Sequence, residues 1–484
     1  MAFKQNPQTP DSPAGENKLA TKPMFPLVLS LSLPAMFSML VQALYNIVDS
    51  IFVAWYSESA LAAVSLVFPV QSLMIAVAVG TGVGLNSVIA RRMGEGRMDR
   101  AQSAAAHGIV LGVFNWAVFA VAGFLLAPAF FGLFTDDPEM LAQCVSYGRI
   151  VTVFSAGIFV QINIEKVFQA TGNMVYPMLF MLVGSIINII LDPIMIFGLL
   201  GFPAMGVVGA AVATVIGQMA SLAFSLWALY RRNPGLPVRM RGFRLDWQTV
   251  RDVYAVGAPS IVMQSIGSVL VAGLNSILAQ FGQTAVSVLG VYFKLQSFVF
   301  MPVFGLTNGV MPVMGFSYGA RNRERLLQAL RVGILLAAVI MTAGTLLFWL
   351  APGALMGIFK PSPELLEMGV TALRTISLGF VPAAVGILLS TLFQALGQAG
   401  RSLTVSAARQ LVVILPVAAF LARYGVGYVW RAFPIAEGVS LVLSLVLFWQ
   451  LYRTRIAAMD TAPRAAAEED GAAGDEALGD EAAL

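Results

Sequence analysis

Residues 27–56 read LVLSLSLPAMFSMLVQALYNIVDSIFVAWY, an apolar run that contains no lysine or arginine. Such a run is long enough to form a helix that crosses a bilayer. Gln42, Tyr45, Asn46 and Asp49 follow the spacing i, i+3, i+4 and i+7, so a helix carries all four on one face. An aspartate inside a membrane-length segment is costly and marks an ion or substrate pathway. This stretch therefore predicts a membrane fold and a candidate site together.

The composition of the whole chain also indicates a membrane protein. Of the 484 residues, 58% are hydrophobic and 11% are charged, whereas soluble proteins carry about 25% charged residues. The single cysteine, Cys144, excludes an internal disulfide. The last part of the chain, 460–484, is rich in Ala, Gly, Glu and Asp, and we expect it to be a disordered acidic tail.

Twelve membrane spans can be placed by length and hydrophobicity. We expect them near 27–56, 60–90, 104–127, 141–167, 175–200, 207–230, 254–280, 284–316, 329–351, 366–393, 402–422 and 429–452. Arginines gather in every second connection, namely at 91–100, 231–251, 321–331, 401–409 and 453–455. The positive-inside rule places these connections, and both termini, in the cytoplasm.

The second half of the chain repeats the first after a shift of 225 residues. The shift aligns Pro34 with Pro259, and the sequence FQATG at 168–172 with FQALG at 393–397. It also aligns Gln71-Ser72 with Gln296-Ser297, Gly80 with Gly305, Gly84 with Gly309, and Arg149 with Arg374. Each repeat holds six spans, so both enter the membrane in the same orientation, and we expect two parallel lobes around a central cavity.

The spans and the repeat divide the chain into five parts. We expect a disordered cytoplasmic tail at 1–24, an N-lobe at 25–230, a cytoplasmic linker at 231–252, a C-lobe at 253–455 and the acidic disordered tail at 456–484. Because each chain holds a complete cavity, we expect a functional monomer that contacts the lipid bilayer.

A second intramembrane aspartate, Asp192, lies at a depth similar to that of Asp49. Both are expected about 10 Å inside the outer face, as judged from the rise of a helix. Two carboxylates that are close together in a low dielectric cannot both stay ionised cheaply, so such a pair binds a proton or a small cation. Asn188 precedes Asp192 by one turn, and Thr214 lies on a polar face of the sixth span. Helix-to-helix hydrogen bonding is the alternative role for Asn188 or Thr214 alone.

Four motifs together resemble the multidrug and toxic compound extrusion (MATE) family: LYNIVDSIF at 44–52, NIILDPIMIFG at 188–198, SFVFMP at 297–302 and MGFSYGARN at 314–322. The resemblance covers about residues 26–452. It implies a transporter of the bacterial inner membrane that exports amphipathic, often cationic, compounds in exchange for H+ or Na+. The family's cation-site residues correspond here to Asp49, Asp192, Asn188, Tyr45, Gln42 and Thr214, and Asp49 with Asp192 would hold Na+ if that is the coupling ion.

The C-half carries no equivalent acids. The repeat places Leu274 opposite Asp49, and Leu415 or Val417 opposite Asp192, so we expect the coupling site in the N-half only. Weaker candidates for substrate contacts in the C-half are Tyr292, Gln296, Lys294, Gln264, Asn275 and Met301. Lys294 could equally extend toward the membrane interface.

Other charged residues are assigned less directly. We expect Arg149 and Arg374 to share a structural role, Glu165 and Lys166 to be interfacial, and Glu437 to be a candidate cavity acid with no assigned partner. His107 is expected to pack or to face solvent. A flippase for a lipid-linked precursor remains the alternative function, and it would need a strongly basic cavity. No motif supports an enzyme, an organic cofactor, a zinc site or nucleic-acid binding.

Overall fold

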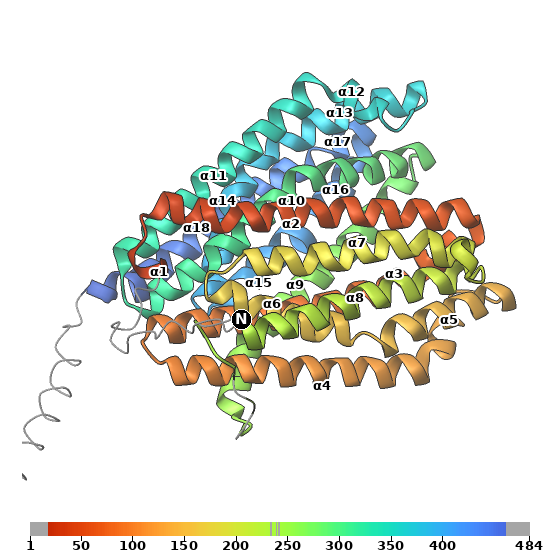
Figure 1. The fold of residues 1–484 in the computed structure, drawn as a ribbon. Coiled ribbons are helices and arrows are strands. Elements are labelled where there is room, and N and C mark those ends of the chain that lie inside the picture. The colour runs from red at the N-terminus through yellow and green to blue at the C-terminus, as the bar shows by residue number, and fades with distance from the viewer. Residues whose placement is uncertain (1–17, 233–234, 239, 241–242, 461–484) are drawn as a thin grey trace, which may run out of the picture.

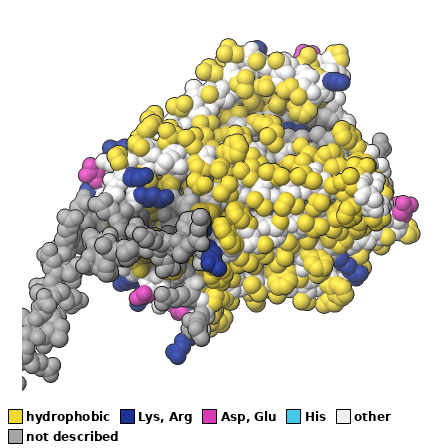
Figure 2. Space-filling model, viewed as in Figure 1, with side chains coloured by type: hydrophobic (Ala, Val, Ile, Leu, Met, Phe, Trp, Pro, Cys, Tyr) yellow, Lys and Arg dark blue, Asp and Glu magenta, His cyan; other side chains and the backbone are white. Residues whose placement is uncertain are grey.

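The computed structural model describes residues 18–232, 235–238, 240 and 243–460 (Figure 1). Twelve helical stretches in these ranges are long and apolar enough to cross a membrane. The described ranges contain no β-strand. Hydrophobic side chains cover the middle of the face in Figure 2, as expected for a surface in contact with lipid. The predicted all-α membrane fold with twelve spans is confirmed.

The N-lobe contains the first six spans. It consists of α2 (Met24–Tyr56), α3 (Glu58–Gly94), α4 (Met98–Phe131), α5 (Pro138–Val153), α6 (Ala156–Ala170), α7 (Val175–Phe197), the short 3-10 turn η1 (Leu199–Gly201) and α8 (Gly206–Arg231). Helices α5 and α6 form one span with a break at Phe154 and Ser155. A short helix, α1 (Lys18–Thr21), precedes this lobe.

The C-lobe repeats this plan. It consists of α9 (Trp247–Ala279), α10 (Gln283–Gly319), α11 (Arg323–Leu350), α12 (Pro352–Gly357), α13 (Pro363–Ile376), η2 (Ser377–Gly379), α14 (Phe380–Ala395), α15 (Ala399–Ala407), the π-helical segment η3 (Ala408–Ile414), α16 (Leu415–Leu421), η4 (Ala422–Tyr424), α17 (Val426–Val429), α18 (Ala432–Leu451), the π-helical η5 (Tyr452–Ile456) and η6 (Ala457–Asp460). Both bounds of α10 lie 225 residues after those of α3, in agreement with the sequence repeat.

Glycines at two repeat-related positions let the lobes touch backbone to backbone. A Cβ atom on Gly84 of α3 would lie 2.1 Å from the carbonyl oxygen of Val253 on α9. In the repeat-related contact, a Cβ atom on Gly309 of α10 would lie 2.9 Å from the backbone nitrogen of Ser32 on α2. Small residues permit this close approach of membrane helices. Helices α2, α3, α9 and α10 therefore form the boundary between the lobes.

The two ends of the bundle differ in what connects the helices. One end holds α1, η6 and the connection between α8 and α9, and we call it the linker end; it lies at the left of Figure 1. The other end, which we call the far end, holds the turns after α2, α4, α7, α9, α11 and α16. Figure 1 shows the helices of the C-lobe diverging from the N-lobe toward the far end.

Three predicted boundaries need correction. Helix α9 begins at Trp247, not at 253, because the Asp246 side chain accepts hydrogen bonds from the backbone of Gln248 and Thr249 and caps the helix. The expected tail at 1–24 includes the ordered helix α1, whose Leu19 is buried. The chain continues as helix to Asp460. The remaining parts of the two predicted tails, 1–17 and 461–484, lie outside the described residues.

Candidate functional site

Three of the predicted cation-site residues meet inside the N-lobe. Asp192 of α7 is fully buried, and Asn188 lies one turn before it. Asn188 Nδ2 donates to Asp192 Oδ1 and to Thr214 Oγ1 of α8, each at 3.3 Å. The structure therefore joins a carboxylate, an amide and a hydroxyl across two neighbouring helices.

Glycines hold α7 and α8 close enough for this contact. A Cβ atom on Gly209 would lie 2.5 Å from the Met195 carbonyl oxygen, and one on Gly217 would lie 2.7 Å from the Gly184 carbonyl oxygen. Thr214 lies between these two glycines in sequence and faces α7 with them. Larger residues at either position would separate the two backbones and lengthen the Asn188–Thr214 hydrogen bond.

The third helix of the site is α2. It packs along α7, and the rings of Tyr56 and Phe197 near the far end are 6.4 Å apart. Asp49 precedes Tyr56 by seven residues, and Asp192 precedes Phe197 by five. With a rise of about 1.5 Å per residue, the two aspartate backbones lie within about 3 Å of the same depth. The backbones of Asp49 and Asp192 therefore lie at similar depth, as expected.

The side chains of Asn46 and Asp49 lie outside the described residues, so the predicted meeting of the two carboxylates stays a prediction. Tyr45 and Gln42, which lie one and two turns before Asp49 on α2, are partly buried.

The oxygen atoms around Asp192 fit a small hard cation. Asn188 Oδ1 is buried and accepts no hydrogen bond within the described part of the chain. Carboxylate, amide and hydroxyl oxygens are the ligands that such cations prefer. A proton could instead occupy the carboxylate, because an uncompensated charge in the membrane is costly. The geometry is compatible with either coupling ion.

Two neighbours of this site were not singled out from the sequence. Gln71 Nε2 of α3 donates to the hydroxyl of Tyr147 on α5 at 3.3 Å. Tyr147 is buried and packs in the same hydrophobic cluster as Val53 of α2 and Ile196 of α7. The sequence contained one signal for Gln71, since Gln71-Ser72 recurs as Gln296-Ser297, but that repeat served only to align the halves.

The weak C-lobe candidates on α10 divide between two faces of the helix. Lys294 and Met301 project within about 40° of Gly305, at 3.6 residues per turn, and Gly305 contacts α2. Lys294 is exposed, and its Nζ lies 6.0 Å from the centre of the Phe359 ring. These two residues continue the boundary face toward the far end, where the lobes separate.

Tyr292 and Gln296 lie on the opposite face of α10, more than about 130° from Gly305. Tyr292 is only 1% exposed and packs edge-on against Phe433 of α18, with 5.7 Å between the ring centres. Both residues therefore point into the C-lobe in this conformation and not toward the space between the lobes.

Helix α9 presents a polar row on its boundary face. Gly257 packs against Gly80 of α3. Gln264 and Asn275 follow Gly257 by seven and eighteen residues, within about 20° of the same direction. Gln264 is exposed and Asn275 is partly exposed. The predicted contact residues on α9 thus lie on the boundary face, closer to the far end than the contact between Gly257 and Gly80.

The structure places three other charged residues of the N-lobe, and Lys166 differs from the sequence-based expectation. Lys166 is 5% exposed and not interfacial, because its Nζ donates to Gln169 Oε1 at 2.8 Å and to Asn308 Oδ1 of α10 at 3.2 Å. Glu165 accepts from Gln161 and Gln169 in the same cluster. Arg149 has the expected structural role, since its Nε donates to the Phe124 carbonyl oxygen at 3.2 Å.

Glu437 has a partner, which the sequence did not reveal. Arg409 donates to it at 2.9 Å. Arg409 was assigned to a basic connection, but it lies in η3 within the span Ala399–Tyr424.

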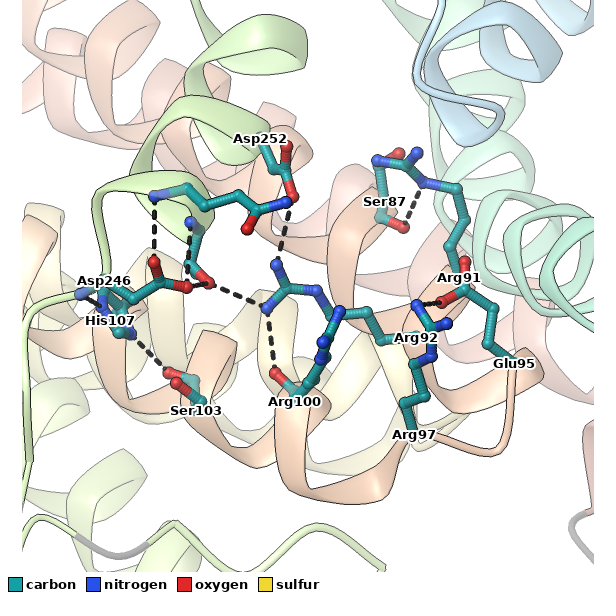
Figure 3. Close-up of polar contacts among 12 residues, drawn as sticks. Ser87, Arg91, Arg92, Glu95, Arg97, Arg100, Ser103, His107, Asp246 and Asp252 are labelled. Atoms are coloured by element: carbon teal, nitrogen blue, oxygen red, sulfur yellow. Dashed lines mark hydrogen bonds and ion pairs between the residues drawn. The ribbon is translucent and has the colours of Figure 1, made fainter. Parts of the chain in front are cut away.

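A polar network closes the linker end between the lobes (Figure 3). The guanidinium group of Arg92 on α3 donates to the Arg100 carbonyl oxygen and to Thr249 Oγ1 of α9, each at 3.0 Å, and to Asp252 Oδ2 of α9 at 3.1 Å. The Arg92 side chain is 11% exposed. A single arginine thus joins the two lobes through both a hydroxyl and a carboxylate.

His107 of α4 extends this network to the linker. Its Nε2 accepts a hydrogen bond from the Asp246 backbone N–H at 2.8 Å, and its ring lies 4.7 Å from that of Phe243. Because Nε2 accepts, the ring is neutral and its Nδ1–H donates to the Ser103 carbonyl oxygen at 2.7 Å. Of the two expected roles for His107, packing is therefore confirmed.

Further hydrogen bonds between the lobes join Ser87 to the Gln394 carbonyl oxygen, Asn115 to Tyr254, and Arg325 to the carbonyl oxygens of Leu19 and Lys22. Within the described residues, the hydrogen bonds between the lobes lie on the linker half of the bundle or near its middle. The conformation is therefore closed at the linker end.

Comparison with known proteins gives matches over most of the chain. The MatE family model matches residues 34–194 and residues 259–420, once in each lobe. The chain is 25% identical over 432 residues to the multidrug export protein MepA of Staphylococcus aureus strain MRSA252, covering 89% of this chain and 94% of MepA.

Solved structures agree with the fold. A structure described as the outward-facing conformation of a multidrug resistance MATE family transporter superposes with a TM-score of 0.87 and 28% identity, covering 93% of this chain and all of that chain. A MOP superfamily transporter from Pyrococcus furiosus superposes with a TM-score of 0.85 and 28% identity over the same shares.

Proposed function

Because the chain belongs to the MatE family, whose model matches both of its lobes, we propose that it is a secondary active exporter of amphipathic compounds, cationic ones included. The similarity to the multidrug export protein MepA supports drugs and other toxic compounds as cargo. We place it in the inner membrane of a bacterium with the linker end and both termini in the cytoplasm, in accord with the arginines at that end. A single chain contains both lobes and is the proposed working unit.

The coupling ion, H+ or Na+, binds at Asp192 together with Asn188, Thr214 and the α2 residues Asp49, Tyr45 and Gln42. The observation that carries this proposal is the buried Asp192–Asn188–Thr214 group, because a carboxylate in the membrane needs a compensating partner. Ion binding neutralises the carboxylate and changes the free energy of the surrounding α2–α7–α8 contacts. The C-lobe has Leu274, Leu415 and Val417 at the repeat-related positions, so coupling is assigned to the N-lobe alone.

Alternating access follows from the position of the contacts between the lobes, namely the Arg92 network and the glycine contacts. In the conformation described, the lobes meet at the linker half, which leaves the boundary faces of α9 and α10 exposed toward the far end. This arrangement suits release of cargo to the outside. Return to the inward-facing state requires the Arg92 network and the glycine contacts to separate while the far ends of the lobes approach each other.

Dye efflux from cells or inverted vesicles tests the proposal. We expect Asp192→Asn to abolish coupled efflux while the protein is still expressed and inserted, and Asp136→Asn, in an exposed loop, to leave efflux unchanged. Repeating the assay without Na+ and with a collapsed proton gradient identifies the coupling ion. Efflux by Asp192→Asn at the wild-type rate under a gradient would refute the site.

A further inference from the structure

The C-lobe contains an ion pair deep inside the membrane span. Arg409 Nη1 and Glu437 Oε1 are 2.9 Å apart, and the two side chains are 27% and 15% exposed. Arg409 lies ten residues after the start of α15, about 15 Å along the helix. Ionised side chains at such depth face a bundle interior or an aqueous cavity and mark functional positions by default.

Helix α18 turns Glu437 away from the lipid. The exposed apolar residues of this helix lie on one broad face centred near Val442 and consist of Ile435, Val439, Val442, Leu445, Val446 and Trp449, each 45–62% exposed. Glu437 projects about 140° away from Val442 on this face. It faces Gly379 in η2, where an added Cβ atom would lie 3.0 Å from Glu437 Cγ. Glu437 therefore points into the C-lobe and not toward the lipid.

The backbone around the pair is irregular on two sides. Arg409 lies in the π-helical segment η3 (Ala408–Ile414), and Gly379 ends the 3-10 turn η2 between α13 and α14. Single π-turns inside α-helices occur frequently at functional sites, because they are less stable than the regular helix. Here one π-helical segment and one 3-10 turn lie beside the ion pair of Arg409 and Glu437.

The pair leaves hydrogen-bonding capacity unused. A guanidinium group has five N–H donors, and a carboxylate has two acceptor oxygens. Within the described part of the chain, Arg409 donates one side-chain hydrogen bond, to Glu437, and Glu437 accepts that one bond only. The pair thus presents a free donor edge beside a free acceptor oxygen. The rings of Tyr292 and Phe433, which pack edge-on against each other, lie next to the pair.

The N-lobe shows that the fold does not require these charges. The 225-residue shift places Gly184 opposite Arg409. Toward the end of the repeat the shift shortens to 219 residues, which pairs Gly206 with Gly425 and places Gln218 opposite Glu437. Both positions of the N-lobe are uncharged, although α7 and α8 pack there in the equivalent way. A buried ion pair is also weak support for stability, because its desolvation cost offsets the attraction.

We propose that Arg409 and Glu437 form a substrate subsite for a zwitterionic group, with the substrate's ammonium on Glu437 and its carboxylate on Arg409. This inference rests on the proposed export function and names a substrate class for it. A bare cation that took Glu437 would leave the charge of Arg409 uncompensated in a low dielectric. A zwitterion compensates both groups and uses both free edges, so the pair selects compounds that carry the two charges together.

A matched pair of dyes tests the selection. Rhodamine 110 is a zwitterion with a free carboxylate, and rhodamine 123 is its cationic methyl ester. We expect Arg409→Gln to reduce rhodamine 110 export about tenfold relative to rhodamine 123, the size expected for loss of a charge-assisted hydrogen bond. Arg423→Gln, which removes an arginine from the far-end turn of the same lobe, should change neither dye. Equal loss of both dyes by an Arg409→Gln protein that is folded and inserted, or loss of neither dye, would overturn the subsite.

Binding to the purified, detergent-solubilised protein separates this inference from the export function. Rhodamine fluorescence anisotropy should show weaker binding of rhodamine 110, but not of rhodamine 123, to Arg409→Gln and to the charge-neutral double variant Arg409→Gln/Glu437→Gln. The double variant covers the case in which the single variant fails to fold. If wild type exports neither dye above the Asp192→Asn background, the proposed function fails, whereas selective binding would still support the subsite. Unchanged binding of rhodamine 110 by the double variant would refute it.

Discussion

Arg92 of α3 and Asp252 of α9 form an ion pair of 3.1 Å across the boundary between the two lobes. The same guanidinium group reaches Thr249 on α9 and the Arg100 carbonyl oxygen within its own lobe. The two residues lie on opposite sides of the boundary that opens in the proposed transport cycle, so in that cycle their attraction contributes to the conformational equilibrium and not only to folding.

We therefore expect Arg92→Gln to shift the protein toward the state that is open at the linker end. Loss of a partly buried, charge-assisted contact of about 1–2 kcal/mol changes a two-state ratio about 5- to 30-fold. Electron spin resonance distances between labels at the exposed positions Asp99 and Glu324, in a Cys144→Ala background, measure the shift. The control is Arg97→Gln, which breaks an exposed pair with Glu95 within the N-lobe. Identical distance distributions in the two variants would contradict the prediction.

The glycine contacts predict a second way to open the linker end. A methyl group on Gly84 would meet the Val253 carbonyl oxygen at 2.1 Å, and the backbone there cannot yield without separating α3 from α9. We expect Gly84→Ala to destabilise the closed conformation by about 1–3 kcal/mol, as for other overpacked sites. Gly290→Ala, with open space around its Cβ position on α10, is the control. The spin-label distances should lengthen for Gly84→Ala and stay unchanged for Gly290→Ala. Unchanged distances in Gly84→Ala together with longer distances in Gly290→Ala would contradict the role of Gly84 in the contact between α3 and α9.

Asn188 should control the ion affinity of the N-lobe site. Asn188→Ala removes the donor to both Asp192 and Thr214, so we expect a several-fold higher concentration of coupling ion for half-maximal efflux. Ser221→Ala is a matched control. Ser221 lies on α8, is buried like Asn188, and also joins α7 to α8, because its hydroxyl donates to the Phe180 carbonyl oxygen of α7 at 2.8 Å. That control should lose about 1 kcal/mol of stability and keep the ion dependence. A Ser221→Ala effect on ion dependence equal to that of Asn188→Ala would indicate that helix packing, and not Asp192, sets the affinity.

Much of the fold could be predicted from the sequence, because the spans are long stretches with few charged residues and the second lobe repeats the first without a gap from Pro34 to Gly172. The shared face of Asn188 and Asp192 follows from helical spacing alone. Their contact with Thr214 depends on the close packing of α7 and α8, which the glycines permit but do not specify.

Other parts of the site depend on tertiary contacts that cannot be predicted from the periodicity of the sequence. The face of Tyr292 and Gln296 could be determined only once Gly305 was known to contact α2. Arg409 was assigned to a cytoplasmic connection because arginines usually lie there, and its true position depends on a π-helical segment and on Glu437, 28 residues away in sequence. The contacts of Arg92 and His107 join elements more than 130 residues apart.

The cap of α9 gives a prediction for pH. The Thr249 hydroxyl, then the backbone N–H groups of Gln248 and Thr249, stabilise the ionised Asp246 and hold its pKa below the usual value of 3.8. The pKa of an aspartate in an unfolded chain is about 3.9. The stabilisation is therefore fully present above the unfolded pKa and is lost only as the pH falls through the lower folded pKa.

Thermal unfolding in detergent across a pH series checks this sign. The difference in Tm between wild type and Asp246→Ala should be constant from pH 8 to pH 5 and should shrink only below about pH 4, where the wild-type carboxylate becomes protonated. Glu95→Ala, which removes an exposed carboxylate near the same end of the bundle, should show no such difference at any pH. A difference that already falls between pH 7 and pH 5.5 would contradict the carboxylate cap.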